Sequence, residues 1–522
     1  MSSRPVMPAR VEHPIPLRTA LHHVVIAGTE QSLLPWIAAA GIGTLLGLAL
    51  TWLPAIVVVS AVIGVGALLL VLKRPEFGIL AILFFTSTIV PEESIPVVEA
   101  GPVQLYISDL ILALLFGIIL LRWLVERSSF RLIRTPLDGL MLGFFGIAVL
   151  ATFWGIQRAT TDISAAIPPL RIVTYYLLFF AVTNLIRSQR QLDTLIRGVF
   201  LLANLVAVTM ILQFALGPDV PILPGRVEIL NTGDARYNDI TRITDFNGES
   251  PILLGLVCAT AVWTRLSPKQ RGLVAWFQWC LLGIGVVLTF NRNFWIGIAL
   301  AVGLVTLLVD AHGRQSLAKL ALSILLVGIV LVSSTAILPE TPVARLTTAS
   351  IQRLLSIVDS RSFAADSQQS TFRWRDFEYN YTLPHIVANP VTGIGFGAQY
   401  RPLVFGIDSP RFDGRTYTHN AHIWIMMSSG VFGYFSFMAL SLLFIFRGLR
   451  GWRKLADRRQ QGIVLGTALT YIGVIIGSIV NPMFMQWHWA PMIGLMMAIN
   501  EVCFRVLPSN TPVQVQPAYG TP

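Results

Sequence analysis

The sequence predicts an all-α protein: a polytopic membrane helix bundle of about 12 to 14 transmembrane helices, with a large, partly helical extracytoplasmic loop. Composition, the length of the apolar runs and the charges between them support this prediction. Of the 522 residues, 54% are hydrophobic and only 12% are charged, unlike a water-soluble domain. The alternation with a period of two that a membrane β-barrel shows is absent.

Individual apolar runs are long enough to cross a bilayer as helices. The runs 33–53, 54–72 and 317–337 each contain about the ~20 residues that a helix needs to span the hydrocarbon core. We therefore expect residues 33–505 to form one polytopic membrane domain. It lies between a cytoplasmic tail at 1–32 and a C-terminal tail at 506–522, both expected to be disordered.

The charges of the loops predict how the chain is oriented. Loops that follow every second span are basic: Lys73 and Arg74; Arg127, Arg131 and Arg134; Arg187 and Arg190; Arg265, Lys269 and Arg271; Arg314 and Lys319; and the run 447–459. The short loops between them are acidic or nearly uncharged. Because basic loops stay in the cytoplasm, both termini are expected there. The net charge of +11 then indicates contact with membrane lipids rather than nucleic acid.

Two loops on the predicted outer side are unusually long, at 218–247 and 338–418. Loops of this length in a compact bundle are usually functional. The segment 345–358 places apolar residues at near-helical spacing beside polar ones, which predicts an amphipathic helix at the membrane interface.

A histidine stands where the larger loop enters the next span. If the helix runs through this region, His419 shares a face with Gly430 and Gly433, so one imidazole lies above a strip of small residues. An imidazole there can take a proton from an acceptor hydroxyl, although a histidine that only caps the helix remains the alternative. His422, one turn further, lacks a third ligand at metal-binding spacing, so no metal site is expected.

Arginines on the same side form a second group of candidates. Arg292 lies at a turn between two spans, and Arg373 and Arg375 precede Asn389 and a glycine-rich segment, 393–397, which is expected to form a flexible turn. A guanidinium fits phosphate oxygens bidentately.

Two alternatives to phosphate binding remain open for the arginines. The outer arginines can simply pair with loop acids such as Asp376 or Glu378. Arg171 and Arg242 lie at span edges, where ionisable residues are candidates for function but can also reach water.

At these residues the sequence resembles the O-antigen ligase and polymerase superfamily. His419 and Asn420, followed by Gly430 and Gly433, match the His-Asn and Gly-x-x-Gly pattern of that family. An upstream family pattern is matched by Arg375, Tyr379, Asn389, Pro390, Gly393, Gly395 and Gly397. Tyr379 replaces the usual tryptophan, which keeps Arg373 as a rival to Arg375.

Arg292 matches the family arginine at the outer start of an earlier helix, and Asn291 replaces the serine that often precedes it. The motifs cover roughly residues 280 to 440, and the ligase-like core corresponds to about 170–500. The resemblance implies a bacterial inner-membrane protein whose active site faces the periplasm or the cell exterior.

The resemblance also implies the reaction: metal-independent transfer of a glycan from undecaprenyl pyrophosphate to an acceptor hydroxyl. The acceptor would be lipid A core, as in lipopolysaccharide synthesis, another lipid-linked glycan, or a protein. His419, Arg292 and Arg375 would be catalytic, and no cofactor is implied. Asn420 would orient the histidine or a sugar. Arg373 as the rival of Arg375, Arg242 and Arg171 at span edges, and His422 one turn after His419 are further candidates for substrate binding, the last three by position rather than by the resemblance. The alternative is a polytopic solute transporter, which would place ionisable residues at the midplane rather than at the outer edge.

Overall fold

The computed structural model describes residues 44, 51, 54–87, 89–90, 97–101, 103–127, 130–220, 222–223, 226–230, 240–244, 248–357, 371–404 and 414–505. The chain divides into two compact units, Met1–Leu70 and Val71–Pro522. Both predicted tails, and nearly all of the predicted span at 33–53, lie outside the described residues. The helix α3 (Ala55–Lys73) corresponds to the predicted span at 54–72.

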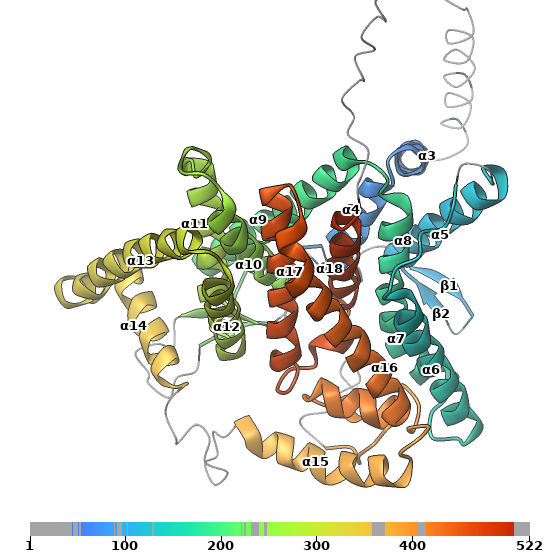
Figure 1. Ribbon diagram of the computed structural model, residues 1–522. Coiled ribbons are helices and arrows are strands. Elements are labelled where there is room, and N and C mark those ends of the chain that lie inside the picture. The colour runs from blue at the N-terminus through green and yellow to red at the C-terminus, as the bar shows by residue number, and fades with distance from the viewer. Residues whose placement is uncertain are drawn as a thin grey trace, which may run out of the picture. The chain divides into compact units, whose positions relative to one another are not determined.

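The second unit is built almost entirely from helices (Figure 1). In chain order they are α4 (Pro75–Ser87), α5 (Ile107–Val125), α6 (Asp138–Gln157), α7 (Ile163–Thr174), α8 (Leu178–Leu185), α9 (Gln189–Leu216), α10 (Glu249–Arg265), α11 (Leu273–Leu288), α12 (Arg292–Leu308), α13 (Ala311–Ile337), α14 (Pro342–Leu355), α15 (Thr371–Ala388), α16 (Ala421–Gly451), α17 (Arg458–Gly477) and α18 (Ala490–Cys503). Short 3-10 turns lie at η2 (Tyr175–Leu177), η4 (Pro268–Gln270), η6 (Gly414–Thr416), η7 (Trp452–Lys454) and η8 (Met483–Met485).

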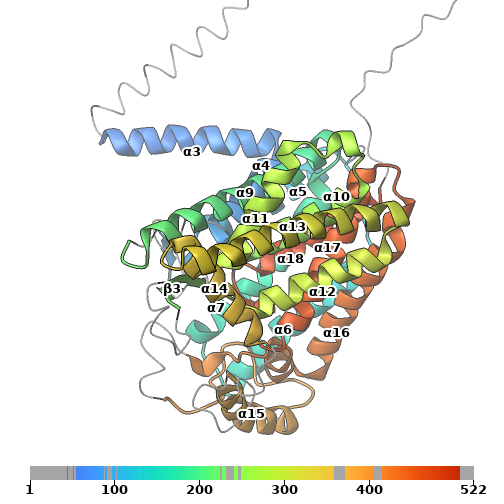
Figure 2. The same cartoon turned by 90° about the vertical axis from the view of Figure 1, so that its left-hand side faces the viewer.

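Seven helices among the described residues are long and apolar enough to cross a membrane: Ile107–Val125, Asp138–Gln157, Ile163–Leu185, Gln189–Leu216, Ala311–Ile337, Ala421–Lys454 and Arg458–Gly477. Shorter apolar helices, including α4, α11, α12 and α18, accompany them. The prediction of an all-α polytopic membrane bundle is therefore confirmed. The long helix α13 lies on the outside of the bundle (Figure 2). Its apolar side chains are exposed along most of its length, as a lipid-facing helix requires.

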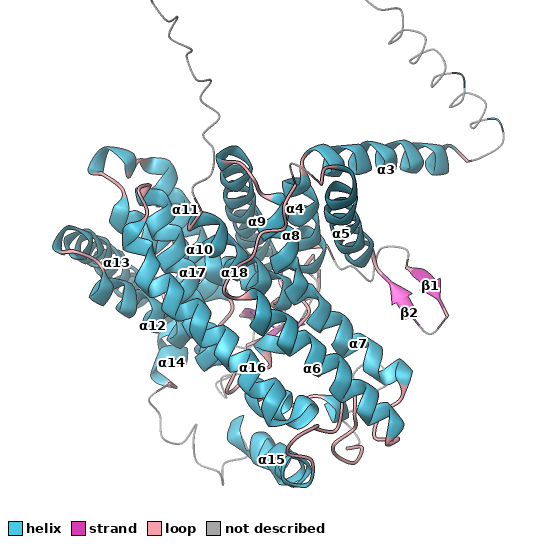
Figure 3. Ribbon diagram, turned by 45° about the vertical axis from the view of Figure 1, so that its right-hand side comes forward, coloured by secondary structure: helices cyan, strands magenta, loops and turns pink. Residues whose placement is uncertain are grey.

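Two small antiparallel hairpins interrupt the helical pattern (Figure 3). One pairs β1 (Val98–Ala100) with β2 (Val103–Leu105), and the other pairs β3 (Arg226–Ile229) with β4 (Thr241–Thr244). Sequence analysis did not predict either hairpin, because strands of three or four residues are too short to produce a clear alternating pattern.

The core of the second unit centres on α10, α17 and α18. Glycines on α17 let α10 approach closely: a Cβ at Gly462 would lie 2.5 Å from the Cα of Val262, and one at Gly466 would lie 2.7 Å from the Cα of Cys258. Small residues allow this contact because membrane helices associate through close packing. The helix α18 is buried along its whole length, so its apolar run marks a central helix rather than a lipid-facing one.

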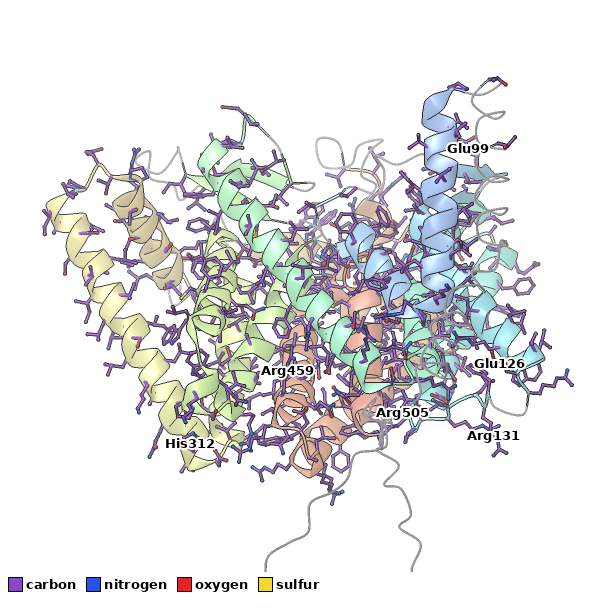
Figure 4. The ribbon with its side chains drawn as sticks, turned by 90° about the horizontal axis from the view of Figure 1, so that it is seen from above. Glu99, Glu126, Arg131, His312, Arg459 and Arg505 are labelled. Atoms are coloured by element: carbon purple, nitrogen blue, oxygen red, sulfur yellow. The ribbon has the colours of Figure 1, made fainter. Side chains whose placement is uncertain are left out.

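Charged side chains lie at the ends of several helices. In Figure 4, Arg131, Arg459 and Arg505 lie toward one end of the helical unit and Glu99 lies toward the other. The segment predicted as an amphipathic helix at 345–358 contains most of α14, which ends at Leu355. The larger loop also contains α15, which lies beside the first part of α16 (Figure 1).

Candidate functional site

The start of α16 is held in place by capping and by contacts with two other segments. The side-chain oxygen of Asn420 accepts hydrogen bonds from the backbone N–H groups of His422 and Ile423, at 3.1 and 3.2 Å. This is the usual way to satisfy the free N–H groups at a helix start. The Asn420 amide also donates to the Tyr379 hydroxyl on α15, at 3.0 Å. These contacts leave His419 as the last residue before the helix cap.

The helix α16 is broken at Gly430, which has a φ of +69°. A Cβ there would lie 2.1 Å from the carbonyl oxygen of Val391. Helical hydrogen bonds lost at the break are replaced by bonds to the segment that follows α15: Ile394 N to Met427 O at 2.9 Å, Gly395 N to Ser428 O at 3.0 Å, and Val431 N to Pro390 O at 2.8 Å. The break is therefore a docking point for the chain between α15 and η6.

This break corrects the predicted arrangement of His419, Gly430 and Gly433 on one continuous helical face. His419 lies outside the helix, and the backbone changes direction at Gly430. The prediction assumed helical dihedral angles throughout, whereas only the tertiary contact with 390–395 makes a non-helical residue favourable here. The small residue at Gly430 admits the protein's own chain.

The glycine-rich segment 393–397 was expected to be a flexible turn, but it is a buried and hydrogen-bonded one. At Gly393 the φ is +64°, and a Cβ would lie 2.4 Å from the carbonyl oxygen of Ser428. A side chain is therefore excluded by both the backbone conformation and the available space. The segment connects α15 tightly to α16, which sets the position of α15 relative to His419.

His419 forms a two-point contact with a buried carboxylate on α15. Its Nδ1 atom lies 2.8 Å from Oε1 of Glu378, and its backbone N–H donates to Oε2 at 3.0 Å. Glu378 is only 1% exposed, whereas the side chain of His419 is 34% exposed. No residue that the structure describes forms a hydrogen bond with Nε2 of His419. One ring nitrogen is thus held by the carboxylate, and the other is available to a ligand.

Sequence reasoning missed the role of Glu378. It treated this acid as a salt-bridge partner for an outer arginine, because acids and arginines alternate along the segment. On α15, Glu378 lies three residues after Arg375, which is one helical turn. That spacing was a usable signal for a shared face, but nothing in the sequence indicated that His419, 41 residues away, would meet it.

Arg375 lies on the same helix and is 9% exposed. Its Nη2 donates to the backbone carbonyl of Val480 at 2.5 Å. Burial lowers the pKa of Arg375 from its ordinary value, Glu378 and Tyr379 oppose that shift, and Arg292 adds to it. The structure therefore brings two predicted site arginines, Arg375 and Arg292, into one electrostatic environment with Glu378. The side chain of the rival, Arg373, lies outside the described residues.

Arg292 is the first residue of α12. The side chain of Asn291 caps this helix by accepting from the backbone N–H of Asn293 at 3.1 Å. The guanidinium of Arg292 reaches the end of α14, where Nη1 donates to the carbonyl of Ser356 at 3.2 Å. The prediction of an arginine at a turn between spans thus corresponds to a helix start next to the larger loop.

His422 has a different environment from His419. Its Nε2 lies 2.9 Å from the carbonyl oxygen of Ile475, and its Nδ1 lies 3.3 Å from the hydroxyl of Tyr434. Both ring nitrogens therefore have partners within the bundle, which favours a structural role over the predicted substrate contact. Within the described ranges, no group of three or more His, Cys, Asp or Glu side chains is arranged to hold a metal ion.

The two remaining candidates lie in other surroundings. Arg171 pairs with Asp109 at 2.7 Å, and its Cζ lies 3.9 Å from the ring centroid of Tyr106 and 4.1 Å from that of Trp487. Arg242 lies on β4, opposite Glu228 on β3. Neither observation assigns these arginines to the environment of His419.

These observations define a multipass membrane protein whose candidate site combines a histidine with a buried carboxylate and two arginines. Residues 279–438 match the family model described as O-antigen ligase. Over this region the chain is therefore similar to O-antigen ligases, a likeness that implies a membrane glycosyltransferase of the ligase or polymerase type. The match covers less than a third of the chain but includes Arg292, Arg375, Glu378, His419 and Asn420. Among curated proteins, no match to this chain was found.

Proposed function

We propose that this protein transfers a glycan from a polyprenyl pyrophosphate, undecaprenyl pyrophosphate in bacteria, to the hydroxyl group of an acceptor. The observation that carries the proposal is the state of His419. Its Nδ1 is held by Glu378, while its Nε2 has no hydrogen-bond partner among the described residues. The family match over residues 279–438 independently supports a ligase or polymerase type of transfer.

In the proposed step, Nε2 of His419 takes the proton of the acceptor hydroxyl as its oxygen attacks the anomeric carbon of the donor. A new bond forms between that oxygen and the anomeric carbon. The bond from the anomeric carbon to the pyrophosphate oxygen breaks, and the lipid pyrophosphate leaves with the electron pair. The proton that His419 receives passes to the solvent or to the leaving group, so the site returns to its starting state.

Arg375 and Arg292 are proposed to bind the pyrophosphate. Negative charge grows on this group as the bond breaks, and fixed cations at that position stabilise the transition state more than the ground state. The positive charge of Arg292 contributes to the lowered pKa of Arg375, because the two cations repel each other. An anion between them would relieve that repulsion. On this proposal the reaction needs neither a metal ion nor a soluble cofactor.

The charge pattern of the loops supports a site on the outer side of the inner membrane, with both termini in the cytoplasm. Three acceptors fit the chemistry: lipid A core, a second lipid-linked glycan, and a protein hydroxyl. Asn420 is proposed to contribute indirectly, since its side chain sets the start of α16 and therefore the position of His419. The 33–505 region is proposed to act as one membrane domain around this site.

Purified protein in lipid, offered a labelled undecaprenyl-pyrophosphate glycan, tests the proposal. Lipid A core, a second lipid-linked glycan and a serine-rich protein are offered in parallel. Wild-type protein is expected to transfer the label to one of them. His419→Ala is expected to lower the rate by about 10²- to 10⁴-fold, the range typical of a lost general base. His312→Ala, at the start of α13, is the matched control and should leave transfer unchanged.

Full activity of His419→Ala, with normal insertion and thermal unfolding, would overturn the assignment of the base. Donor binding without transfer to any of the three acceptors would argue against the enzyme and for a carrier of lipid-linked glycans. The acceptor that receives the label in the wild type would identify the protein as a ligase, a polymerase or a protein glycosyltransferase.

A further inference from the structure

We infer that Glu378 is the positioning residue for His419, and that Trp374 and Arg401 hold the Glu378 carboxylate in the required place. The inference rests on the proposed function, because it assigns how the base is made ready for the acceptor. It concerns two residues, Trp374 and Arg401, that the sequence analysis did not single out and one, Glu378, that it regarded as a salt-bridge partner for arginine.

The hydrogen-bond contacts around Glu378 fit a carboxylate that accepts through both oxygens. Oxygen Oε1 receives the indole N–H of Trp374 at 3.0 Å and faces Nδ1 of His419 at 2.8 Å. Oxygen Oε2 receives the backbone N–H of His419 at 3.0 Å. When Nδ1 of His419 carries its proton, both oxygens act as acceptors at once, which a carboxylate can do and the amide of a glutamine cannot do without turning one donor against another.

Arg401 supports this arrangement from the other side of Trp374. Its Cζ lies 5.3 Å from the centroid of the Trp374 ring, and Arg401 is 6% exposed. A buried cation over an indole is attracted by the negative face of the ring, so Arg401 keeps Trp374 in the orientation that points its N–H at Glu378. The chain around Arg401 is anchored to α15, because His385 Nε2 lies 3.2 Å from the carbonyl oxygen of Tyr400.

The consequence for His419 is a defined tautomer. Since Glu378 only accepts, Nδ1 of His419 must carry a proton, and the lone pair is then on Nε2. That is the nitrogen without a hydrogen-bond partner in the described part of the chain. The carboxylate also stabilises the imidazolium that forms when Nε2 takes the acceptor proton, as the carboxylate of a catalytic triad does.

Several other charged or titratable groups surround this pair. Those on α15 are Arg375 and Tyr379, that on α12 is Arg292, and those on the segments before α16 are Tyr400, Arg401 and Tyr417. A pH profile therefore reports on the whole group, so the test compares variants that change one member each.

Glu378→Gln is the principal test, with Asp376→Asn as the matched control on the exposed side of the same helix. In the lipid transfer assay, Glu378→Gln is expected to lower kcat by about 10²- to 10⁴-fold, as expected when the orienting carboxylate of a histidine base is lost. KM for the donor should change by less than about threefold, because the arginines remain. Asp376→Asn should match the wild type in both.

The pH dependence of the residual activity separates a positioning role of Glu378 from a purely structural one, because a structural role would leave it unchanged. Without the carboxylate, the imidazolium loses a stabilising anion. The acidic limb of the activity profile of Glu378→Gln is therefore expected to lie at lower pH than in the wild type. Removal of the cation in Arg401→Gln is expected to move the same limb to higher pH, because the imidazolium then faces less positive charge.

Two conservative variants test the geometry. Glu378→Asp keeps the charge but withdraws it by one methylene group. Its kcat should therefore be at least about tenfold higher than that of Glu378→Gln. Trp374→Phe keeps an aromatic ring beneath Arg401 but removes one donor to Oε1, and about a 3- to 10-fold loss is expected. Both variants are checked for unchanged monodispersity and thermal unfolding in detergent.

Wild-type activity of Glu378→Gln, together with inactive His419→Ala, would overturn this inference and leave the proposed function intact. Equal loss in Glu378→Gln and Glu378→Asp without any shift of the acidic limb would also overturn it, because that pattern indicates a structural carboxylate. Failure of the wild type to transfer to any acceptor would instead count against the proposed function itself.

Discussion

Two clusters in this protein pair a nitrogen base or cation with a carboxylate, and the surroundings of the two pairs differ. In the first, the buried Glu378 holds one nitrogen of His419, and the other has no hydrogen-bond partner among the described residues. In the second, Asp109 contacts Arg171 at 2.7 Å while the rings of Tyr106 and Trp487 lie within about 4 Å of the guanidinium. The side chain of His419 is 34% exposed, whereas those of Arg171 and Asp109 are 16% and 13% exposed and lie against aromatic rings.

The comparison shows that residue type and position at a span edge do not separate function from structure. Both clusters lie at ends of membrane helices, and sequence analysis named a member of each as a candidate. The difference lies in what surrounds the side chain after folding. A pair with a free acceptor atom can act in chemistry, but a pair flanked by aromatic rings stabilises the helices that supply those rings.

We expect the largest effect from a substitution that breaks the pair of Arg171 and Asp109. Arg171→Ala leaves Asp109 as a poorly compensated carboxylate beside the hydroxyl of Tyr175, and loss of one partner of this partly buried ion pair costs up to about 3 kcal/mol, the lower end of the range for buried pairs. We expect a clear fall in the thermal unfolding temperature in detergent, with the rate per folded molecule within about threefold of the wild type. Adding Asp109→Asn should restore part of the stability. A selective loss of transfer with normal unfolding would instead place Arg171 in the active site.

Arg375→Lys is the matching test of the cluster around His419. Its expected effect is smaller in free energy and falls on transfer activity rather than on stability. A lysine keeps the charge but loses the planar fork of donors, so we expect about a 10²-fold fall in transfer with little change in unfolding temperature. Arg373→Lys is the control and should be nearly normal. If Arg373→Lys were inactive and Arg375→Lys normal, the motif register on α15 would have to move by two residues.

The smallest expected effect concerns the connection between α15 and the start of α16. Tyr379→Phe removes the hydroxyl that accepts from Asn420, a single hydrogen bond worth about 1 kcal/mol. We expect transfer to fall by about fivefold or less, and the unfolding temperature to change slightly. Unchanged activity together with a normal unfolding temperature would show that the Asn420 cap alone fixes the position of His419.

Sequence analysis predicted the membrane bundle, because apolar runs of span length and alternating loop charge depend only on local composition. It also singled out His419, Arg292 and Arg375 from motif spacing. It did not predict the break at Gly430, since a non-helical residue in a helix is favourable only when another segment supplies the missing hydrogen bonds. That segment, 390–395, is distant from Gly430 in sequence.

The sequence by itself therefore determined the class of the protein, its membrane-spanning helices and the side chains from which the site is built. Only the tertiary structure decided which of those side chains meet. Glu378 was one acid among several until α15 docked against α16, and packing pairs Arg171 with Asp109 beside the rings of Tyr106 and Trp487. Whether a segment spans the membrane depends on its own residues. Which partner a buried charge meets depends instead on the packing of helices that are far apart along the chain.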